Sequence, residues 1–290
     1  MARLRRLLFR LFVRLVGICP WCVVYAVAAA VGRFVYCFDA KRRTGLAANL
    51  SVVLGPAADP RRRQNLVRTV FRNHAWTMAE HMALASMRRR DHEKRVTIVN
   101  RRYLDEALAR GRGGVLVLPH VGNWEWAGAA LAILGYPLNV VAGEQFSRDL
   151  SPLVKEMKKR LNIGVISPEG TFRSILRALH KNEFVALLLD GDVYEGGVEV
   201  EFFGRRAVLP SGAAVLALRT GAAIVCGATA RQRPGHLTVV CHELIIADPD
   251  RDDEVSVTQH LAQYLEKPIC DNIDQWCIFR PLWGAGDVVQ

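Results

Sequence analysis

The chain has 290 residues, of which 51% are hydrophobic, and a formal net charge of +11. This length fits one large domain, or one domain with a membrane segment, and argues against two independent soluble domains. The charge is uneven, because residues 1–112 carry 23 Lys and Arg against 7 Asp and Glu (+16), whereas residues 113–290 carry 16 against 21 (−5). No zinc-finger spacing, RNP-like strand or Arg/Gly repeat accompanies the basic residues, so we expect an anionic membrane surface as the partner, and no nucleic acid.

A basic amphipathic segment opens the chain. Arg3, Arg6, Arg10 and Arg14 fall within about 80° of one another on a helical wheel, and apolar residues fill most of the remaining circumference. A helix of this kind lies in the membrane interface, where its basic face meets anionic lipid.

The next segment, residues 15–38, is almost wholly apolar and is interrupted only by Pro20 and Arg33. It reaches the roughly 20 residues needed to cross a bilayer. Arg33 is costly at mid-bilayer but can snorkel near one end, so a single-pass span and an in-plane, monotopic anchor both remain open. We expect residues 1–40 to form the membrane anchor and residues 41–290 to form the main domain.

The sequence contains seven cysteines, two of them in a C-x-x-C motif at Cys19 and Cys22. This motif lies inside the apolar stretch and not between a strand and a helix of a βαβ unit, where a redox motif is expected. We therefore expect reduced thiols.

The main domain begins with a helical region, over residues 41–110, that has a turn at Gly55 to Pro60. The apolar run VLVLP then has the length of a buried strand, and WEWAGAALAILG reads as a helix that ends at Gly135. His120 consequently lies at a strand-to-helix junction.

Apolar strand-like runs alternate with helical patterns through the rest of the chain. Strands are expected at LNVVA, VIS, FVALLLD, VEVEFFG, AAIVCGATA and HLTVVCHELII, and helices at LVKEMKKRL, SILRALHK, PSGAAVLALRTG and VTQHLAQYLEK. This alternation predicts an α/β fold with a mixed central sheet flanked by helices, preceded by the N-terminal helical anchor.

His120 and Glu125 form an H-x-x-x-x-E pair at the junction. An imidazole has an unperturbed pKa near 6.5 and suits a general base, and a nearby carboxylate can fix its tautomer. A strand-to-helix turn could bring Glu125 round towards His120. The alternative is that Glu125 only complements the positive end of the helix while His120 packs at the junction.

The block LPHVGNWEWAG resembles the active-site block of the bacterial lipid A biosynthesis (late) acyltransferases, a family that includes the mycobacterial phosphatidylinositol mannoside acyltransferases and whose block reads H-x-G-N-W-[DE]. Further similar blocks follow in order: LVKEMKKRLNIGVI, FVALLLDGD, GVEVEFFGRRAVLPSGAAVLALRTGA and QWCIFRPLW. The resemblance covers roughly residues 1–285 and is most specific over residues 115–228.

The resemblance implies an O-acyltransferase that needs no metal or redox cofactor. Its co-substrate would be an acyl thioester of acyl carrier protein or coenzyme A, and its acceptor a hydroxyl of a membrane glycolipid such as a lipid A precursor or a phosphatidylinositol mannoside. His120 would be the general base, Glu125 its motif partner and Glu199 a second acid, with Glu201 as the alternative. We expect the protein at the cytoplasmic face of the plasma (inner) membrane.

Five further residues are candidates for substrate binding. Asn123 belongs to the motif, and Lys158 and Arg160 could hold the anionic part of the donor. Asp190 and Asp192 follow a buried strand within the shared stretch. The competing interpretation is a solvated helix face for the two cations and a simple strand end before a glycine turn for the two aspartates.

One block points to a different acyltransferase. Residues 167–173, SPEGTFR, resemble the E-G-T-R block of the glycerolipid acyltransferases, which would imply lysophosphatidate as acceptor. Phe172 interrupts that block, the first motif lacks the N-H-x-S form, and the FFG stretch belongs to the other family, so Glu169 and Arg173 are expected to be structural. A non-catalytic lipid-binding protein is the remaining alternative.

Overall fold

The computed structural model describes residues 11, 13–84, 87, 89–141, 151–167, 171–191 and 197–284. Within them a seven-stranded sheet has the order β1-β9-β8-β2-β5-β3-β4, and all neighbours are parallel except β8 and β9. Its strands are β1 (Val96–Val99), β2 (Gly114–Leu118), β3 (Leu138–Val141), β4 (Ile163–Ile166), β5 (Phe184–Leu188), β8 (Ala223–Arg233) and β9 (His236–Ile245). The predicted mixed α/β fold is confirmed.

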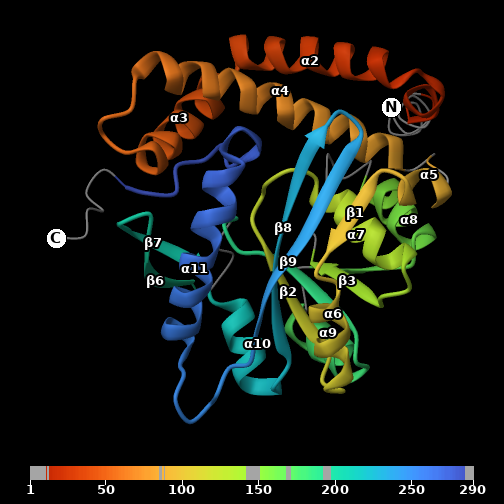
Figure 1. Cartoon of the computed structure of the whole chain (residues 1–290), viewed down its shortest axis with the longest axis vertical. Helices are drawn as coiled ribbons and strands as arrows, with labels where there is room; N and C mark the ends of the chain where they lie inside the picture. Colours follow the sequence, from red (N-terminus) through yellow and green to blue (C-terminus); the bar gives the residue numbers. More distant parts are fainter. Residues whose placement is uncertain are drawn as a thin grey trace.

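Helices cover both faces of the sheet (Figure 1). They are α2 (Trp21–Phe38), α3 (Ala40–Leu54), α4 (Pro60–Leu84), α5 (Arg89–Glu93), α6 (Arg102–Ala109), α7 (Trp124–Ile133), α8 (Ser151–Arg160), α9 (Thr171–His180), α10 (Gly212–Thr220) and α11 (Glu254–Asp271), followed by the short 3-10 helix η1 (Ile273–Gln275). Buried side chains of α6 and α7 pack on one face, and those of α9, α10 and α11 pack on the other.

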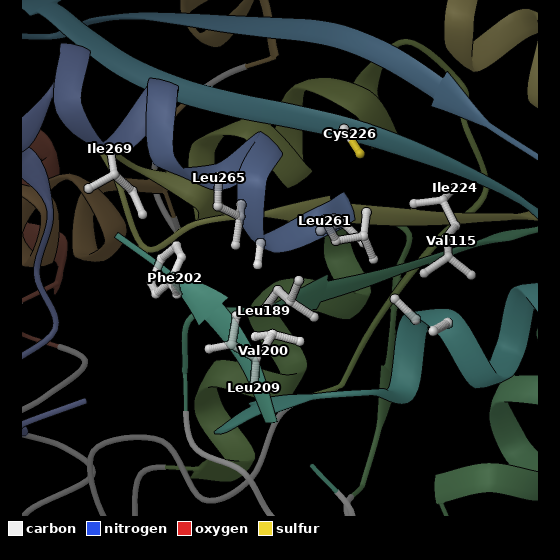
Figure 2. Packing of buried hydrophobic residues seen from close by; sticks show 14 of the residues in the cluster. Val115, Leu189, Val200, Phe202, Leu209, Ile224, Cys226, Leu261, Leu265 and Ile269 are labelled. Atoms are coloured by element: carbon white, nitrogen blue, oxygen red, sulfur yellow. The ribbon is translucent and has the colours of Figure 1, made fainter. Parts of the chain in front are cut away.

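The alternation of side chains along β2 divides the core in two. Val115 and Val117 pack into the larger cluster with α10 and α11, whereas Leu116 packs on the opposite face with α6. Figure 2 shows the larger cluster, where Leu261 and Leu265 of α11 lie close to the strands. Both faces of β2 are therefore buried, which explains its continuous apolar sequence.

Two parts of the sheet differ from the sequence-based expectation. The VEVEFFG strand, β6 (Gly197–Phe202), does not join the central sheet but pairs antiparallel with β7 (Arg205–Pro210), a strand that we did not expect. The region expected to be helical also contains β1, which pairs parallel with β9 at the sheet edge. The short VTIV run has no helical period, and its extended backbone is stabilised by pairing with β9 and by packing of Val96 and Ile98 against neighbouring apolar side chains.

The apolar N-terminal segment is divided at Pro20, which precedes α2 and has the extended backbone of a helix start (ψ 137°). Helix α2 has the length and composition of a membrane span, with a mean hydropathy of 1.7 over 18 residues. It also lies along the outer side of α4 (Figure 1). Gly32 allows this close approach, because a Cβ atom there would lie 2.8 Å from the carbonyl oxygen of Phe71.

Candidate active site

The register of two neighbouring strands brings His120 and Asp190 together. Leu118 of β2 is paired with Leu188 of β5, and these are the last residues of the two strands. His120 and Asp190 each follow two residues later, so both lie beyond the carboxyl edge of the sheet. This edge is where open α/β sheets bind their ligands.

The carboxylate of Asp190 orients the imidazole of His120. Its Oδ1 atom lies 2.8 Å from Nδ1 of His120, and both of its oxygens accept from the backbone N–H of His120, at 3.0 and 2.9 Å. The indole Nε1 of Trp276 donates to Oδ2 at 2.8 Å. Because Asp190 is fully buried and faces Nδ1, the proton of neutral His120 is held at Nδ1 and its Nε2 is left as the basic nitrogen.

The C-terminal segment and Gly191 enclose the histidine. The backbone N–H of Cys277 donates to the carbonyl oxygen of His120 at 3.1 Å, and burial together with the charge of Asp190 raises the pKa of the Cys277 thiol. A Cβ atom at Gly191 would lie 2.9 Å from Cε1 of His120, so this position admits only glycine without a shift of the ring. His120 keeps 22% of its side chain exposed.

Glu125, the other end of the motif, is paired with a cation. Its Oε1 accepts from Nζ of Lys158 at 3.0 Å, and its Oε2 lies 3.9 Å from Nε2 of His81. Glu125 is 8% exposed and Lys158 is 3% exposed, so the ion pair is buried. Asp190, and not Glu125, lies next to the imidazole of His120.

His120, Glu125 and Lys158 line one cavity of about 800 Å³. Apolar side chains of the central strands and of α6 and α7 form most of its wall, among them Leu104, Leu116, Leu131, Leu138, Val225 and Cys241. The cavity therefore places a basic nitrogen and a buried ion pair beside a volume suited to a long apolar group.

The other predicted binding residues lie in different surroundings. Asn123 is fully buried and does not line the cavity, since its side chain caps α7 and contacts Glu80. Arg160 is exposed and pairs with Glu156, one turn earlier in α8. Asp192 lies outside the described residues.

Glu199 is on the exposed side of the β6–β7 hairpin. Its side chain is 62% exposed, and its Oε1 lies 3.5 Å from Nη1 of Arg206. Among the contacts of the part of the chain that the structure describes, none joins Glu199 or Glu201 to His120. A catalytic role for either glutamate stays a prediction from the resemblance.

Sequence reasoning missed two groups that hold the site. Trp276 belongs to the C-terminal block QWCIFRPLW, and nothing in its spacing predicts that its indole binds Asp190. The sequence does not reveal the buried pair of Glu80 and Arg231, because a charged residue within a helix or near the end of a strand is usually exposed to solvent. The signal for this pair is Arg231 itself, a charged residue in the largely apolar and buried strand β8.

Over the described ranges, no three His, Cys, Asp or Glu side chains gather as a metal site. The polar groups of Asp190 and Trp276 around His120 form hydrogen bonds with His120 or with one another.

The chain is similar in sequence to known acyltransferases. Residues 4–284 match the family model described as bacterial lipid A biosynthesis acyltransferase. A phosphatidylinositol mannoside acyltransferase from Mycolicibacterium smegmatis is 30% identical over 276 residues, which cover 91% of this chain and 89% of the relative. A protein of the same description from Mycobacterium tuberculosis is 32% identical over 187 residues, 63% of this chain and 58% of the relative.

Proposed function

The chain belongs to the bacterial lipid A biosynthesis acyltransferase family, and from this premise we propose that it moves a fatty acyl chain from a thioester to a hydroxyl group of a membrane glycolipid. One observation carries the proposal: the imidazole of His120 is oriented by the buried Asp190 and faces a large apolar cavity. The cavity would hold the acyl chain, and the imidazole would act on the acceptor hydroxyl.

In the proposed reaction, Nε2 of His120 takes the proton of the acceptor hydroxyl as its oxygen attacks the thioester carbonyl carbon. The carbon–oxygen bond forms, and the carbonyl electrons move onto the oxygen of a tetrahedral intermediate. When the intermediate collapses, the carbon–sulfur bond breaks and the thiolate leaves with the proton held by the imidazolium. Asp190 stabilises the imidazolium through Nδ1 and keeps the ring oriented in both steps.

Lys158 is our candidate for stabilising negative charge in the cavity. Its ammonium donates to Glu125 and lies in the cavity wall, where few other charges compete with it. In a cavity of low polarity, an ammonium interacts more strongly with an oxyanion or a donor phosphate than it would in water. In this proposal Glu125 fixes Lys158, which assigns the motif acid a role different from that of orienting His120.

The relatives support our proposal for the acceptor class. Two similar proteins are described as phosphatidylinositol mannoside acyltransferases, so we propose a hydroxyl of a phosphatidylinositol mannoside or of a comparable glycolipid such as a lipid A precursor. Either acyl carrier protein or coenzyme A could deliver the chain, because both present the same thioester.

We propose that helix α2 anchors the protein in the membrane, at the cytoplasmic face of the plasma membrane. The apolar side chains of α2 that remain exposed include Val23, Val27, Val31, Phe34 and Phe38. They recur every three or four residues and so form one face of the helix, while the opposite face packs on α4. This arrangement favours an in-plane anchor over a span, because a spanning helix would have to leave α4.

The experiment is an acyl-transfer assay with purified protein in vesicles. The donors are radiolabelled acyl-coenzyme A and the radiolabelled acyl thioester of acyl carrier protein. Each is incubated with phosphatidylinositol mannosides, a lipid A precursor or lysophosphatidate, and the products are identified by mass spectrometry. We expect an acylated glycolipid. Acylation of lysophosphatidate alone would identify the glycerolipid alternative, and lipid binding without any product would identify a non-catalytic protein.

A further inference from the structure

A buried ion pair joins helix α4 to strand β8 next to the catalytic junction. Nη2 of Arg231 lies 2.7 Å from Oε2 of Glu80, and Nε of Arg231 lies 2.7 Å from Oε1. Glu80 is 2% exposed and Arg231 is 8% exposed. Burial alone opposes the charge on Arg231, but its hydrogen bonds with Glu80 and the charge of Glu80 raise its pKa. The pair is therefore bidentate and charged inside the protein.

Glu80 also holds the start of α7. Its Oε2 accepts from Nδ2 of Asn123 at 2.8 Å, and Oδ1 of the same Asn123 accepts from the backbone N–H of Trp126 at 3.0 Å. This second bond caps the helix, so the orientation of the cap depends on Glu80. On the same helix as Glu80, the hydroxyl of Thr77 donates to the carbonyl oxygen of Gly122 at 2.9 Å.

Strand β8 fixes the same loop from a second direction. The Oγ1 atom of Thr229 accepts from the backbone N–H of Asn123 at 3.1 Å and donates to the carbonyl oxygen of Val121 at 2.5 Å. Gly122 has a φ of +66°, and a Cβ atom there would lie 2.7 Å from the carbonyl oxygen of Thr229. The three residues that follow His120 are thus fixed by α4 and β8.

The fourth bond to Glu80 comes from the apolar helix α2. The hydroxyl of Tyr25 donates to Oε1 of Glu80 at 2.5 Å and accepts from the backbone N–H of Gly235 at 2.5 Å. Tyr25 is 6% exposed. Glu80 consequently accepts two bonds on each oxygen, which uses the full hydrogen-bonding capacity of a carboxylate.

We propose that Glu80 is a positioning residue that couples the membrane-facing helix α2 to the strand-to-helix junction carrying His120. The inference rests on the proposed function, since it assigns His120 the chemistry. Tyr25, Glu80 and Arg231 do not line the cavity, so they act on the reaction through Asn123 and Gly122. Docking of α2 on α4 completes the bonds of Glu80, and loss of that contact loosens the junction.

The test removes one hydroxyl from α2. Tyr25→Phe deletes the bond to Glu80, together with the bond from Gly235, and keeps the ring. The matched control Tyr36→Phe deletes a hydroxyl on the same helix that, among the described residues, accepts a single 3.3 Å bond from Arg68. We expect Tyr25→Phe to lower kcat about tenfold, because small displacements at a reacting centre are costly, while KM for the donor stays within about twofold. Tyr36→Phe should leave both constants unchanged.

Hydrogen–deuterium exchange of residues 119–126 provides a readout that needs no activity. Faster exchange there in Tyr25→Phe than in Tyr36→Phe, together with the lower kcat, supports the coupling. An unchanged kcat per folded enzyme, or a lower kcat without faster exchange at these residues, overturns it. A wild-type protein that transfers no acyl group defeats the proposed function instead, and the exchange data then decide the coupling alone.

Discussion

Asp190 contacts His120 three times, once at the ring nitrogen Nδ1 and twice at the backbone N–H, while Trp276 donates to its second oxygen. A carboxylate held in this way cannot rotate without losing bonds on both oxygens. The orientation of the imidazole is therefore set by buried groups and does not depend on the substrate.

Asp190→Asn should remove most of the activity. The amide keeps the shape but cannot stabilise the imidazolium, and it allows the wrong tautomer, so we expect kcat to fall by about 10³-fold or more. Steady-state kinetics measure the loss, and circular dichroism checks the fold. The control is Asp271→Asn, which changes an exposed carboxylate paired with Lys267.

Comparison with Glu199→Gln decides which acid orients the histidine. We expect a much smaller loss for Glu199→Gln, because its side chain is exposed and paired with Arg206. If the Glu199 variant loses as much activity as the Asp190 variant, the geometry assigned to Asp190 is not the one used in turnover.

The buried pair of Lys158 and Glu125 predicts unequal effects of single and double substitutions. Lys158→Met removes the ammonium partner of a buried carboxylate and should lower the free energy of unfolding by about 3–5 kcal/mol. The double variant Glu125→Gln and Lys158→Met should recover most of that loss, because no buried charge is left uncompensated. Urea denaturation of the three proteins measures the difference, and equal stability of the single and double variants would contradict it.

The same double variant tests the role of the pair in the reaction. If Lys158 stabilises negative charge in the cavity, the stable double variant has a low kcat. Full activity in the double variant would leave the pair with a structural role only.

Cavity-filling at Ala186 should change the preferred chain length. Ala186 lies on β5, pairs with Leu116 and Val140 across the sheet, and lines the cavity. In Ala186→Phe, each methylene that can no longer be buried costs about 0.8 kcal/mol, or roughly fourfold in kcat/KM. A series of acyl donors measures the shift, with short donors as the internal control. An equal loss for short and long donors would show that the cavity does not hold the chain.

Stability should fall as the solution becomes acidic. Burial lowers the pKa of both His74 and His92 to about 4, against about 6.5 in an unfolded chain. Between these pH values the unfolded state binds more protons than the folded state. The contribution of the two histidines to the free energy of unfolding is therefore complete above about pH 6.5. It falls by about 1.4 kcal/mol per pH unit for each histidine as the pH drops towards 4. Urea midpoints at pH 7 and pH 5 test this.

The control for the acid effect is His260→Gln, at an exposed histidine that pairs with Glu243. We expect His92→Phe to weaken the dependence on pH and His260→Gln to change it little. A pH dependence that is identical in His92→Phe and wild type would rule out His92 as a source.

Local sequence patterns predicted most of the fold. The apolar runs gave β2, β5 and β8 because strands buried on both faces need continuous apolar sequence. The same patterns did not reveal the partners of each strand, since pairing depends on the whole sheet. For this reason the sequence predicts a helical region where β1 lies, and it predicts that β6 extends a sheet that it does not join.

The sequence predicts part of the candidate site but not its contacts. The sequence predicts His120 as a general base and Asp190 as a substrate-binding residue. Their contact follows from the pairing of Leu118 with Leu188, which joins strands 70 residues apart in register. The five-residue spacing to Glu125 is a weaker guide, because the start of a helix fixes the backbone position of a residue but does not determine which side chain it contacts.

The most direct test of the central claim is transfer by His120→Gln protein in vesicles. Glutamine cannot accept the hydroxyl proton as an imidazole does. With labelled acyl-coenzyme A or acyl-carrier protein and a glycolipid acceptor, we expect the folded, membrane-bound variant to lose transfer by about 10³-fold or more while still binding the donor. Transfer at the wild-type rate would contradict the assignment of His120 as general base.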